Sequence, residues 1–293
     1  LLIQQMSQEG DSILIPTPTF NGQLQMLASL KRKIIEIPAD HRGIDLERLE
    51  FFMKQGSAKL CLLTANFQNP LGYCLSHQQK QKIAQLAQQY QCFILEDDIY
   101  GECSFQKERP LPIRYWDQQG YVIWCGSVSK SLSSAYRVGW FCLGQQLQHL
   151  RPQLLANNIG VNTPLQLGLA DFIYSRGYRE HLEGLRPKLM QQVEQYRAYI
   201  LEVFNGIPIA LSQSQGGYAL WMQLPENMTG LALYYLAHSQ GINIVPGEVF
   251  GEDLRYQHFI RLNAGHALTP EIRQAIQQLA DWVRESYLSQ SRL

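Results

Sequence analysis

Short runs of almost entirely apolar residues recur through the first half of the chain and alternate with segments of helical periodicity. The runs lack the alternating polarity of a half-exposed sheet, which indicates buried strands. We expect these strands at residues 12–16, 33–38, 59–65, 92–97 and 121–127. Strands and helices that alternate in this way predict an α/β fold with a mostly parallel sheet covered on both faces.

The segment between the third and the fourth expected strands has the pattern of an amphipathic helix. Ser76 and Gln79 have the spacing of a capping box, and the apolar residues from Ile83 to Tyr90 fall on one face. In parallel sheets with helical crossovers, ligands bind beyond the carboxyl ends of the strands. Polar residues that directly follow the expected strands are therefore the first candidates for a functional site.

The pattern changes near residue 180. A long helix is expected to end near Asn205-Gly206, because these apolar residues keep one face: Leu185, Leu189, Val193, Tyr196, Ile200 and Val203. Strands are expected at 218–224, 242–245 and 258–262, and helices at 230–239 and from the Thr269-Pro270 cap onward. We therefore predict a large α/β domain over residues 1–180, followed by an interdomain helix and a smaller α+β domain over residues 181–293.

The composition limits the classes of partner. With 293 residues, of which 45% are apolar, the chain is long enough for two domains with cores of their own. Its 25 acidic and 25 basic residues cancel, so this segment gives no electrostatic reason to expect binding to nucleic acid or to an anionic membrane. No stretch approaches the ~20 apolar residues of a membrane span and no signal peptide is visible, so we expect a cytoplasmic protein.

The cysteines and histidines give no sign of a metal site. The six cysteines lie mostly within apolar runs and form no C-x-x-C pair, which is typical of buried thiols in a reducing compartment. The seven histidines lack the spacing of zinc ligands, so we expect no bound metal. The chain begins at Leu1 without methionine and already in a helical pattern, so we expect a piece of a longer protein.

A serine-rich turn with a lysine and an arginine follows the strand expected at residues 121–127. Desolvation at the end of a buried strand lowers the pKa of a lysine amine, and a neutral amine can form a Schiff base with an aldehyde. Lys130 is in this position, and the hydroxyl of Ser127 and the guanidinium of Arg137 are groups that bind phosphate. By itself, such a segment is more often a solvated loop.

Two other lysine motifs are excluded by the neighbouring residues. A Walker A loop requires glycine directly before its lysine and again five residues earlier, where Ser129 and Trp124 stand. Ser127 and Lys130 match the S-x-x-K of penicillin-binding enzymes, but the sequence lacks the S-x-N and K-T-G elements of that class.

The strand expected at residues 92–97 ends in an acidic cluster. A carboxylate at the end of a buried strand is unfavourable unless a cation meets it, and a protonated pyridine nitrogen is such a cation. Asp97 would hold that nitrogen, and Tyr100, one turn further on, would place its phenol on a ring oxygen. The alternative is an acidic strand end that is solvated, caps a helix or binds magnesium.

Two more polar residues stand out against apolar surroundings. Asn69 follows the strand expected at residues 59–65 in an Asn-Pro-x-Gly turn, although such a turn before a helix is common. Arg261 lies inside an apolar strand, where its charge requires a partner. A substrate carboxylate would supply one with two hydrogen bonds, and a structural salt bridge is the alternative.

The order of these residues resembles that of a known family. Asn-Pro-x-Gly, Asp-x-x-Tyr, Ser-x-x-Lys with arginine, and a strand arginine follow one another as in fold-type I pyridoxal-phosphate (PLP) enzymes of aminotransferase class I/II. The resemblance covers essentially the whole chain. Residues 96–100, 121–140, 216–221 and 261–266 are also similar to the C-terminal domains of MocR-type regulators of the GntR superfamily. In those regulators a winged-helix DNA-binding domain precedes an aminotransferase-like domain.

The resemblance implies a role for each candidate residue at the cofactor ring. Lys130 would form the internal aldimine with PLP and, in a transaminase, would move the α-proton of the substrate to the cofactor. Asp97 would pair with the pyridine nitrogen, while Tyr100 and Asn69 would hydrogen-bond the ring oxygen. Phe20 would stack on the ring.

The resemblance also implies how the phosphate and the substrate are held. Ser127 and Arg137 would hold the phosphate, and Arg261 would bind the carboxylate of an amino acid. In this family a glycine-serine turn ahead of the first strand binds the phosphate as well. Residues 1–6 resemble the helix after that turn, so the turn is expected upstream of this chain, as is a tyrosine donated by the other subunit of a homodimer.

The favoured interpretation is a PLP-binding aminotransferase-type domain that acts on an amino acid or amine, as the effector domain of a GntR/MocR-type transcriptional regulator. The alternatives are a free-standing cytosolic aminotransferase and a cofactor-free fragment that serves only for dimerisation. DNA would be contacted only through a domain outside this chain. The resemblance leaves open whether transamination is completed, because a regulator can use the first exchange of amines as a sensor.

Overall fold

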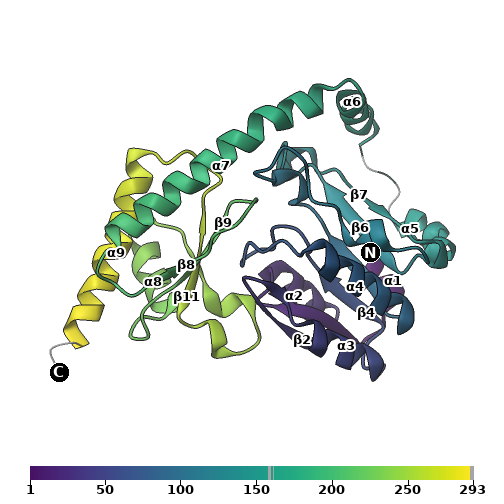
Figure 1. Ribbon diagram of the computed structural model, residues 1–293, viewed down its shortest axis with the longest axis horizontal. Coiled ribbons are helices and arrows are strands. Elements are labelled where there is room, and N and C mark those ends of the chain that lie inside the picture. The colour runs from purple at the N-terminus through teal and green to yellow at the C-terminus, as the bar shows by residue number, and fades with distance from the viewer. Residues whose placement is uncertain (158–159, 161, 291–293) are drawn as a thin grey trace.

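Two β-sheets and a long helix that runs along one side of the molecule, from the smaller sheet toward the larger, dominate the computed structural model, which describes residues 1–157, 160 and 162–290 (Figure 1). The strands of the larger sheet lie in the order β3 (Gly43–Ile44), β2 (Lys33–Asp40), β1 (Ser12–Thr17), β4 (Leu60–Leu63), β5 (Phe93–Asp97), β6 (Val122–Ser127) and β7 (Gly139–Cys142). The five from β2 to β6 run parallel, and the two edge strands run antiparallel to their neighbours. All five expected strands are present, which confirms the α/β class.

The helices that accompany this sheet are α1 (Leu2–Met6), α2 (Asn21–Ser29), α3 (Leu46–Lys54), α4 (His77–Gln89), α5 (Arg151–Asn157) and α6 (Thr163–Tyr174). They cover both faces because successive strand residues point to opposite sides. Leu14 of β1 belongs to a core with Ile83 of α4, whereas its neighbour Ile13 belongs to a core with Leu27 of α2. The central strands β1 and β4 are thus buried on two sides, as their apolar runs predict, whereas β2 is only partly buried.

The second half of the chain builds a smaller antiparallel sheet in the order β10 (Val245–Pro246), β11 (Phe259–Asn263), β9 (Ala219–Gln223) and β8 (Ala210–Leu211). Helices α7 (Gly177–Val203), α8 (Gly230–Ser239) and α9 (Pro270–Gln290) pack with it in one core. The expected stripe of α7 is buried there from Leu189 to Val203, at the positions Leu189, Val193, Tyr196, Ile200 and Val203. No described helix is both long and apolar enough to cross a bilayer.

Two expected helix starts are confirmed by their hydrogen bonds. The hydroxyl of Ser76 accepts from the N–H of Gln79, whose side chain accepts from the N–H of Ser76, which completes the capping box of α4. Thr269 Oγ1 accepts from the N–H of Ile272 at 3.4 Å in the first turn of α9. These side chains satisfy backbone donors that a helix start leaves free.

The structure differs from the expectation at the sheet edges. The strand expected at residues 242–245 is reduced to Val245–Pro246, because Gly241 turns with φ 72° and Ile242 donates its N–H to Ala237 at the end of α8. Strand β7 was not expected, since all four of its residues are exposed and show no alternation. Residue 180 lies within the continuous helix α7, so the domain division near that residue stays a prediction.

Candidate functional site

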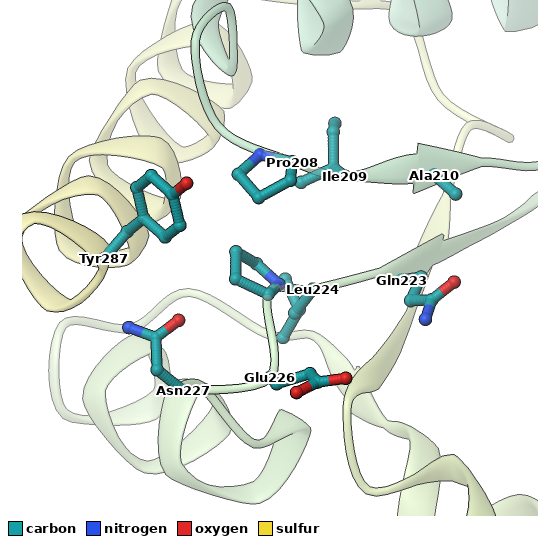
Figure 2. A pocket seen from close by; sticks show the side chains of 9 residues that line it. Pro208, Ile209, Ala210, Gln223, Leu224, Glu226, Asn227 and Tyr287 are labelled. Atoms are coloured by element: carbon teal, nitrogen blue, oxygen red, sulfur yellow. The ribbon is translucent and has the colours of Figure 1, made fainter. Parts of the chain in front are cut away.

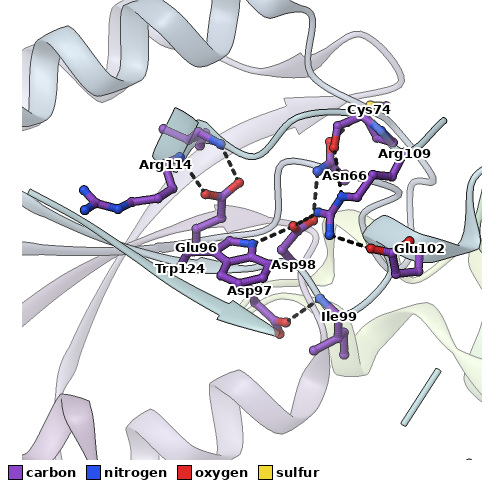
Figure 3. A network of polar contacts seen from close by, with 12 residues as sticks. Asn66, Cys74, Glu96, Asp97, Asp98, Ile99, Glu102, Arg109, Arg114 and Trp124 are labelled. Atoms are coloured by element: carbon purple, nitrogen blue, oxygen red, sulfur yellow. Dashed lines mark hydrogen bonds and ion pairs between the residues drawn. The ribbon is translucent and has the colours of Figure 1, made fainter. Parts of the chain in front are cut away.

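Asp97 ends β5 as a partly buried carboxylate with weak hydrogen bonds. Its oxygens accept from the Gln23 amide at 3.4 Å and from the Ile99 N–H at 3.3 Å (Figure 3). Burial is the largest cause that raises the pKa of Asp97, and the charge of Lys130 acts in the opposite direction. A cation brought to this carboxylate would therefore be strongly favoured.

Asp98, the next residue, already has its cation. In Figure 3 its side chain points away from that of Asp97, and it forms an ion pair with Arg109. It also accepts from Trp124 Nε1 at 2.7 Å and from Asn66 Nδ2 at 2.8 Å. Of the two adjacent aspartates, only Asp98 forms an ion pair with a described residue, which leaves Asp97 as the carboxylate suited to a ligand.

Lys130 and Tyr100 lie at the same edge of the sheet as Asp97. Asp97 of β5 is paired with Cys125 of β6, and Lys130 follows shortly after β6. The Nζ atom of Lys130 is 5.8 Å from the centroid of the Tyr100 ring. Burial raises the pKa of Tyr100 to about 12, so its phenol keeps its proton at neutral pH and can donate it in a hydrogen bond. The amine, the phenol and the carboxylate thus meet in one region.

Arg261 of β11 faces this region from the smaller sheet and lacks an anionic partner. Its Nε atom is buried and has no hydrogen-bond partner. Burial lowers the pKa of Arg261, and among the described residues its electrostatic neighbours are the phenols of Tyr100 and Tyr218, not a carboxylate. The structure therefore gives no support to the structural salt bridge that the sequence left open. A ligand carboxylate would supply the missing charge.

The Asn69 turn and the Phe20 turn lie beside each other. Asn69 is 7% exposed, and its Oδ1 atom has no partner, which leaves a buried acceptor free for a donor on a ligand. Gln68, directly before it, donates its amide to the carbonyl of Pro18 at 2.7 Å. Phe20 is 43% exposed and holds its ring over Gly22 at the start of α2, the helix that carries Gln23.

Ser127 and Arg137 lie at the same end of the β6–β7 pair. The Ser127 hydroxyl donates to the carbonyl of Val138 at 2.7 Å and lies 2.9 Å from the hydroxyl of Ser129. Arg137 adopts a left-handed conformation with φ 52°, and its guanidinium has a weak contact of 3.4 Å with the carbonyl of Ser134. The exposed guanidinium is therefore free to bind an anion, and the phosphate role of these two residues stays a prediction.

Two cavities differ in their relation to these residues. One of about 400 Å³ opens on Asp97, with Gln23, Leu95 and Cys125 among its lining residues. Another of about 600 Å³ lies between the β8–β9 end of the smaller sheet and the side chain of Tyr287 on α9 (Figure 2). The second cavity contains none of the candidate residues. The lining of the first includes Asp97 but not Lys130, Tyr100 or Arg261.

Three residues near the site were missed in the sequence. Gln23 contacts Asp97 and Trp124 contacts Asp98, and no pattern marks either residue. Tyr218 packs its ring edge-on against Tyr100 at 5.5 Å. The glycine pair before Tyr218 was a usable signal, because a Cβ atom at Gly216 would lie 2.6 Å from the ring of Phe67. Only glycine allows so close an approach.

Comparison with known proteins assigns these features to a family. A lysine and a partly buried aspartate at the end of the parallel sheet, with an arginine of the smaller sheet that forms no ion pair with a described residue, suit a ligand of mixed charge. Residues 1–279 match the aminotransferase class I and II family. The chain belongs to this family, whose cofactor is pyridoxal 5'-phosphate.

The relatives include both regulators and enzymes. The HTH-type transcriptional regulator YdcR of Escherichia coli is 32% identical over 97% of this chain and 61% of its own length. Aromatic-amino-acid aminotransferase 1 of Thermococcus litoralis is 28% identical over 94% of this chain and 67% of its own length. The chain spans about three fifths of the length of the regulators it matches.

Solved structures confirm the fold-type I, PLP-dependent transferase-like architecture. The multiple substrate aminotransferase of Thermococcus profundus superposes with a TM-score of 0.85 at 27% identity, over 98% of this chain and 73% of that one. LysN of Thermus thermophilus, complexed with N-(5'-phosphopyridoxyl)-L-leucine, superposes with a TM-score of 0.87 at 24% identity, over 98% and 74%. The second likeness concerns the fold alone.

Glu96, next to the site, makes the stability of the protein depend on pH. It is fully buried, accepts from the N–H groups of Ile113 and Arg114 at 2.8 and 3.1 Å, and burial raises its pKa to about 8 from 4.5. The folded state thus holds this proton more tightly than the unfolded state. The stability from Glu96 is complete below pH 4.5, and it is lost as the pH rises toward 8.

We therefore expect the Glu96→Gln variant, which stays neutral, to lose less stability than the wild type between pH 5 and pH 8. The two unfolding free energies should diverge by up to about 1.4 kcal/mol per pH unit. Differential scanning fluorimetry and urea titration at several pH values measure this. Glu226 is exposed, and Glu226→Gln is the matched control. Its unfolding free energy should change with pH at the same slope as that of the wild type. A wild-type slope in Glu96→Gln would contradict the raised pKa.

Proposed function

We propose that this chain binds pyridoxal 5'-phosphate through Lys130 and uses it on an amino acid or amine. The observation that carries the proposal is that the described residues form no ion pair with Asp97 or Arg261, while Lys130 acts electrostatically on Asp97 and lies 5.8 Å from the ring of Tyr100, a neighbour of Arg261. When bound, the cofactor acts as an electron sink for the α-carbon of an amine substrate. The protein's own residues bind, orient and move protons around it.

At the ring, each proposed role follows from a group left free by the fold. The carboxylate of Asp97 holds a proton on the pyridine nitrogen, and the phenol of Tyr100 donates to the ring oxygen. The orphaned oxygen of Asn69 accepts from a protonated ring hydroxyl, or its amide donates once the side chain is reversed. The half-exposed ring of Phe20 offers a stacking surface.

At the phosphate and the substrate, the roles are electrostatic. Ser127 and Arg137 bind the phosphate through a hydroxyl and a guanidinium. We assign the transfer of the substrate's α-proton to Lys130, whose amine can accept a proton and lies at the same edge of the sheet as Asp97 and Tyr100. Arg261 binds the carboxylate of the substrate.

We expect Arg261→Leu to weaken binding of amino acids by about 10-fold or more, because the variant loses charged hydrogen bonds. Binding of PLP should remain within about threefold, since that role lies with other residues. Spectral titration of the PLP-loaded protein with amino acids measures the first value, and fluorescence titration with PLP measures the second. The exposed Arg179→Leu is the control. Equal amino-acid affinity in Arg261→Leu and the wild type would remove Arg261 from this role.

We also propose that the chain is the effector domain of a GntR/MocR-type regulator, in a cytoplasmic protein that contacts DNA through another domain. The similarity to the HTH-type regulators YdcR and YjiR over 97% of the chain supports this. Residues 1–180 would form the cofactor domain and residues 181–293 the interdomain helix and small domain. The proposal rests on the relatives' names, so the decisive measurement is made on the full-length protein.

The likeness to the Thermococcus litoralis enzyme favours a free-standing aminotransferase as the second candidate. The two functions differ in turnover. With an amino acid and a 2-oxo acid acceptor, an enzyme should form many equivalents of product per PLP, whereas a sensor should show one spectral change and little product. Sustained turnover together with no effect of the amino acid on DNA binding by the full-length protein would reject the regulator.

Exposed apolar side chains support the proposal of a homodimer. Leu167 and Tyr174 of α6 are 62% and 88% exposed, and Phe141 of β7 is 42% exposed. Apolar surface of this kind is typical of subunit contacts. Light scattering during gel filtration should give twice the subunit mass, and a monomer at micromolar concentration would contradict the proposal.

A further inference from the structure

The turn that carries Lys130 is held from outside by helix α7. Ser131, directly after Lys130, is 2% exposed. Its hydroxyl lies 2.6 Å from the hydroxyl of Tyr178, and its carbonyl oxygen lies 2.7 Å from Nε2 of His181. Because a carbonyl oxygen only accepts, His181 must carry a proton on Nε2 and donate it. Two side chains one turn apart on α7 thus bind the hydroxyl and the carbonyl oxygen of one residue.

The rest of the turn has little freedom. Val128 is fully buried, and its carbonyl accepts from the N–H groups of Leu132 and Ser133 at 2.9 and 3.1 Å. The carbonyl of Lys130 itself lies 3.4 Å from the sulfur of Cys103, on the segment that follows Tyr100. The backbone on both sides of Lys130 is therefore fixed. The contacts between Ser131 and α7 determine where this part of the turn lies.

Contacts with other segments fix the position of helix α7. The rings of Tyr178 and His181 stack at 6.4 Å with an angle of 18° between them. Further along, the guanidinium of Arg186 donates to the carboxylate of Glu102 at 2.8 Å and to its carbonyl at 3.1 Å. The second half of the helix is buried in the core of the smaller sheet. A shift of Tyr178 and His181 would have to break these contacts.

We propose that Tyr178 and His181 are positioning residues for Lys130. They fix Ser131, and through it the direction in which the Lys130 amine points, without acting on the cofactor themselves. This inference rests on the proposed function of Lys130. The placement matters because a displacement of about 1 Å at a reacting group can lower a rate by about 100-fold.

The test compares variants that remove or keep the donor at position 181. His181→Leu removes the N–H that donates to the Ser131 carbonyl, and His181→Gln keeps an N–H of similar reach. Tyr178→Phe removes the hydroxyl that contacts the Ser131 hydroxyl. The control is His149→Leu, which removes an exposed ring whose Nδ1 lies 3.0 Å from the carbonyl of Gln146. In the PLP-loaded protein, the visible absorption band is measured as a function of pH. We expect His181→Leu to move the midpoint of this titration by about one pH unit, and Tyr178→Phe to move it in the same direction.

Rescue separates positioning from a merely structural role. His181→Gln should keep the wild-type midpoint within a few tenths of a unit, and His149→Leu should keep it too. If His181 only stabilised the fold, His181→Leu would lower the melting temperature and leave the midpoint unchanged. A wild-type midpoint in His181→Leu, or a midpoint in His181→Gln that equals that of His181→Leu, would overturn the proposal.

A measurement on the cofactor-free protein keeps this test independent of the proposed function. The protein is methylated with formaldehyde and cyanoborohydride. Peptide mass spectrometry then gives the rate of methylation of Lys130 relative to that of the exposed Lys107. We expect the Lys130 to Lys107 ratio to rise by about threefold or more in His181→Leu, because a released amine reaches solvent more often, and to be unchanged in His181→Gln. An unchanged ratio in His181→Leu would overturn the positioning role, even if Lys130 proves not to bind PLP.

Discussion

Lys130→Ala is expected to abolish the visible absorption band that PLP gives when it is bound to the full-length protein, and to lower any transamination by about 1,000-fold. The variant loses both the amine that binds the cofactor aldehyde and the group that moves the α-proton. Absorption spectra during PLP titration and single-turnover assays with an amino acid measure the two effects. The fold should persist, because alanine removes no buried hydrogen bond of the Lys130 side chain.

One other lysine serves as the control for this result, and a second is already engaged by the protein. Lys107 is exposed, and Lys107→Ala should keep the wild-type band. Lys80 is fully buried, but its Nζ atom donates to Asn66 at 2.6 Å, so it is engaged in the network around Asp98 and is not free for an aldehyde. A band that survives in Lys130→Ala would show that another amine holds the cofactor and would remove Lys130 from its role.

Most of the candidate residues stand out in the sequence because they lie at or shortly after the ends of apolar strands. Parallel strands end at one edge of a sheet, so chemistry at the ends of β4, β5 and β6 converges without knowledge of long-range contacts. This rule marks Asn69, Asp97 and Lys130 as candidates, and the family resemblance supplies the roles predicted for them. Arg261 is found by another rule, since a charge within an apolar strand needs a partner.

The rest depends on contacts between segments that are distant in sequence. The sequence predicts a role for Asp97, but the ion pair of its neighbour Asp98 with Arg109 is a contact that no local pattern shows. The contacts of Ser131 with α7 span 47 and 50 residues, and neither Tyr178 nor His181 carries a pattern. The edge strands could not be predicted for a different reason. Short exposed strands such as β7 leave no periodic signal, because neither face is buried.

Asp97→Asn is expected to raise the dissociation constant for PLP by about 30-fold or more, because removal of one member of a buried charge pair typically costs about 2–5 kcal/mol. Transamination should fall further, since the ring nitrogen loses the anion that holds its proton. Asparagine fills the same volume, so the fold should persist. Equilibrium titration with PLP and turnover at saturating PLP measure the two effects separately.

The neighbouring aspartate supplies the sharpest control. Asp98→Asn breaks the ion pair with Arg109 and should lower the melting temperature, whereas Asp97→Asn should not, because Asp97 has no ion pair of its own to lose. The pH dependence should differ too. Burial raises the pKa of Asp97, so acid protonates it and weakens PLP binding in the wild type, and Asp97→Asn should lack this acid limb. Wild-type PLP affinity in Asp97→Asn at every pH would mean that the pyridine nitrogen faces another group, and the arrangement proposed for the cofactor would be wrong.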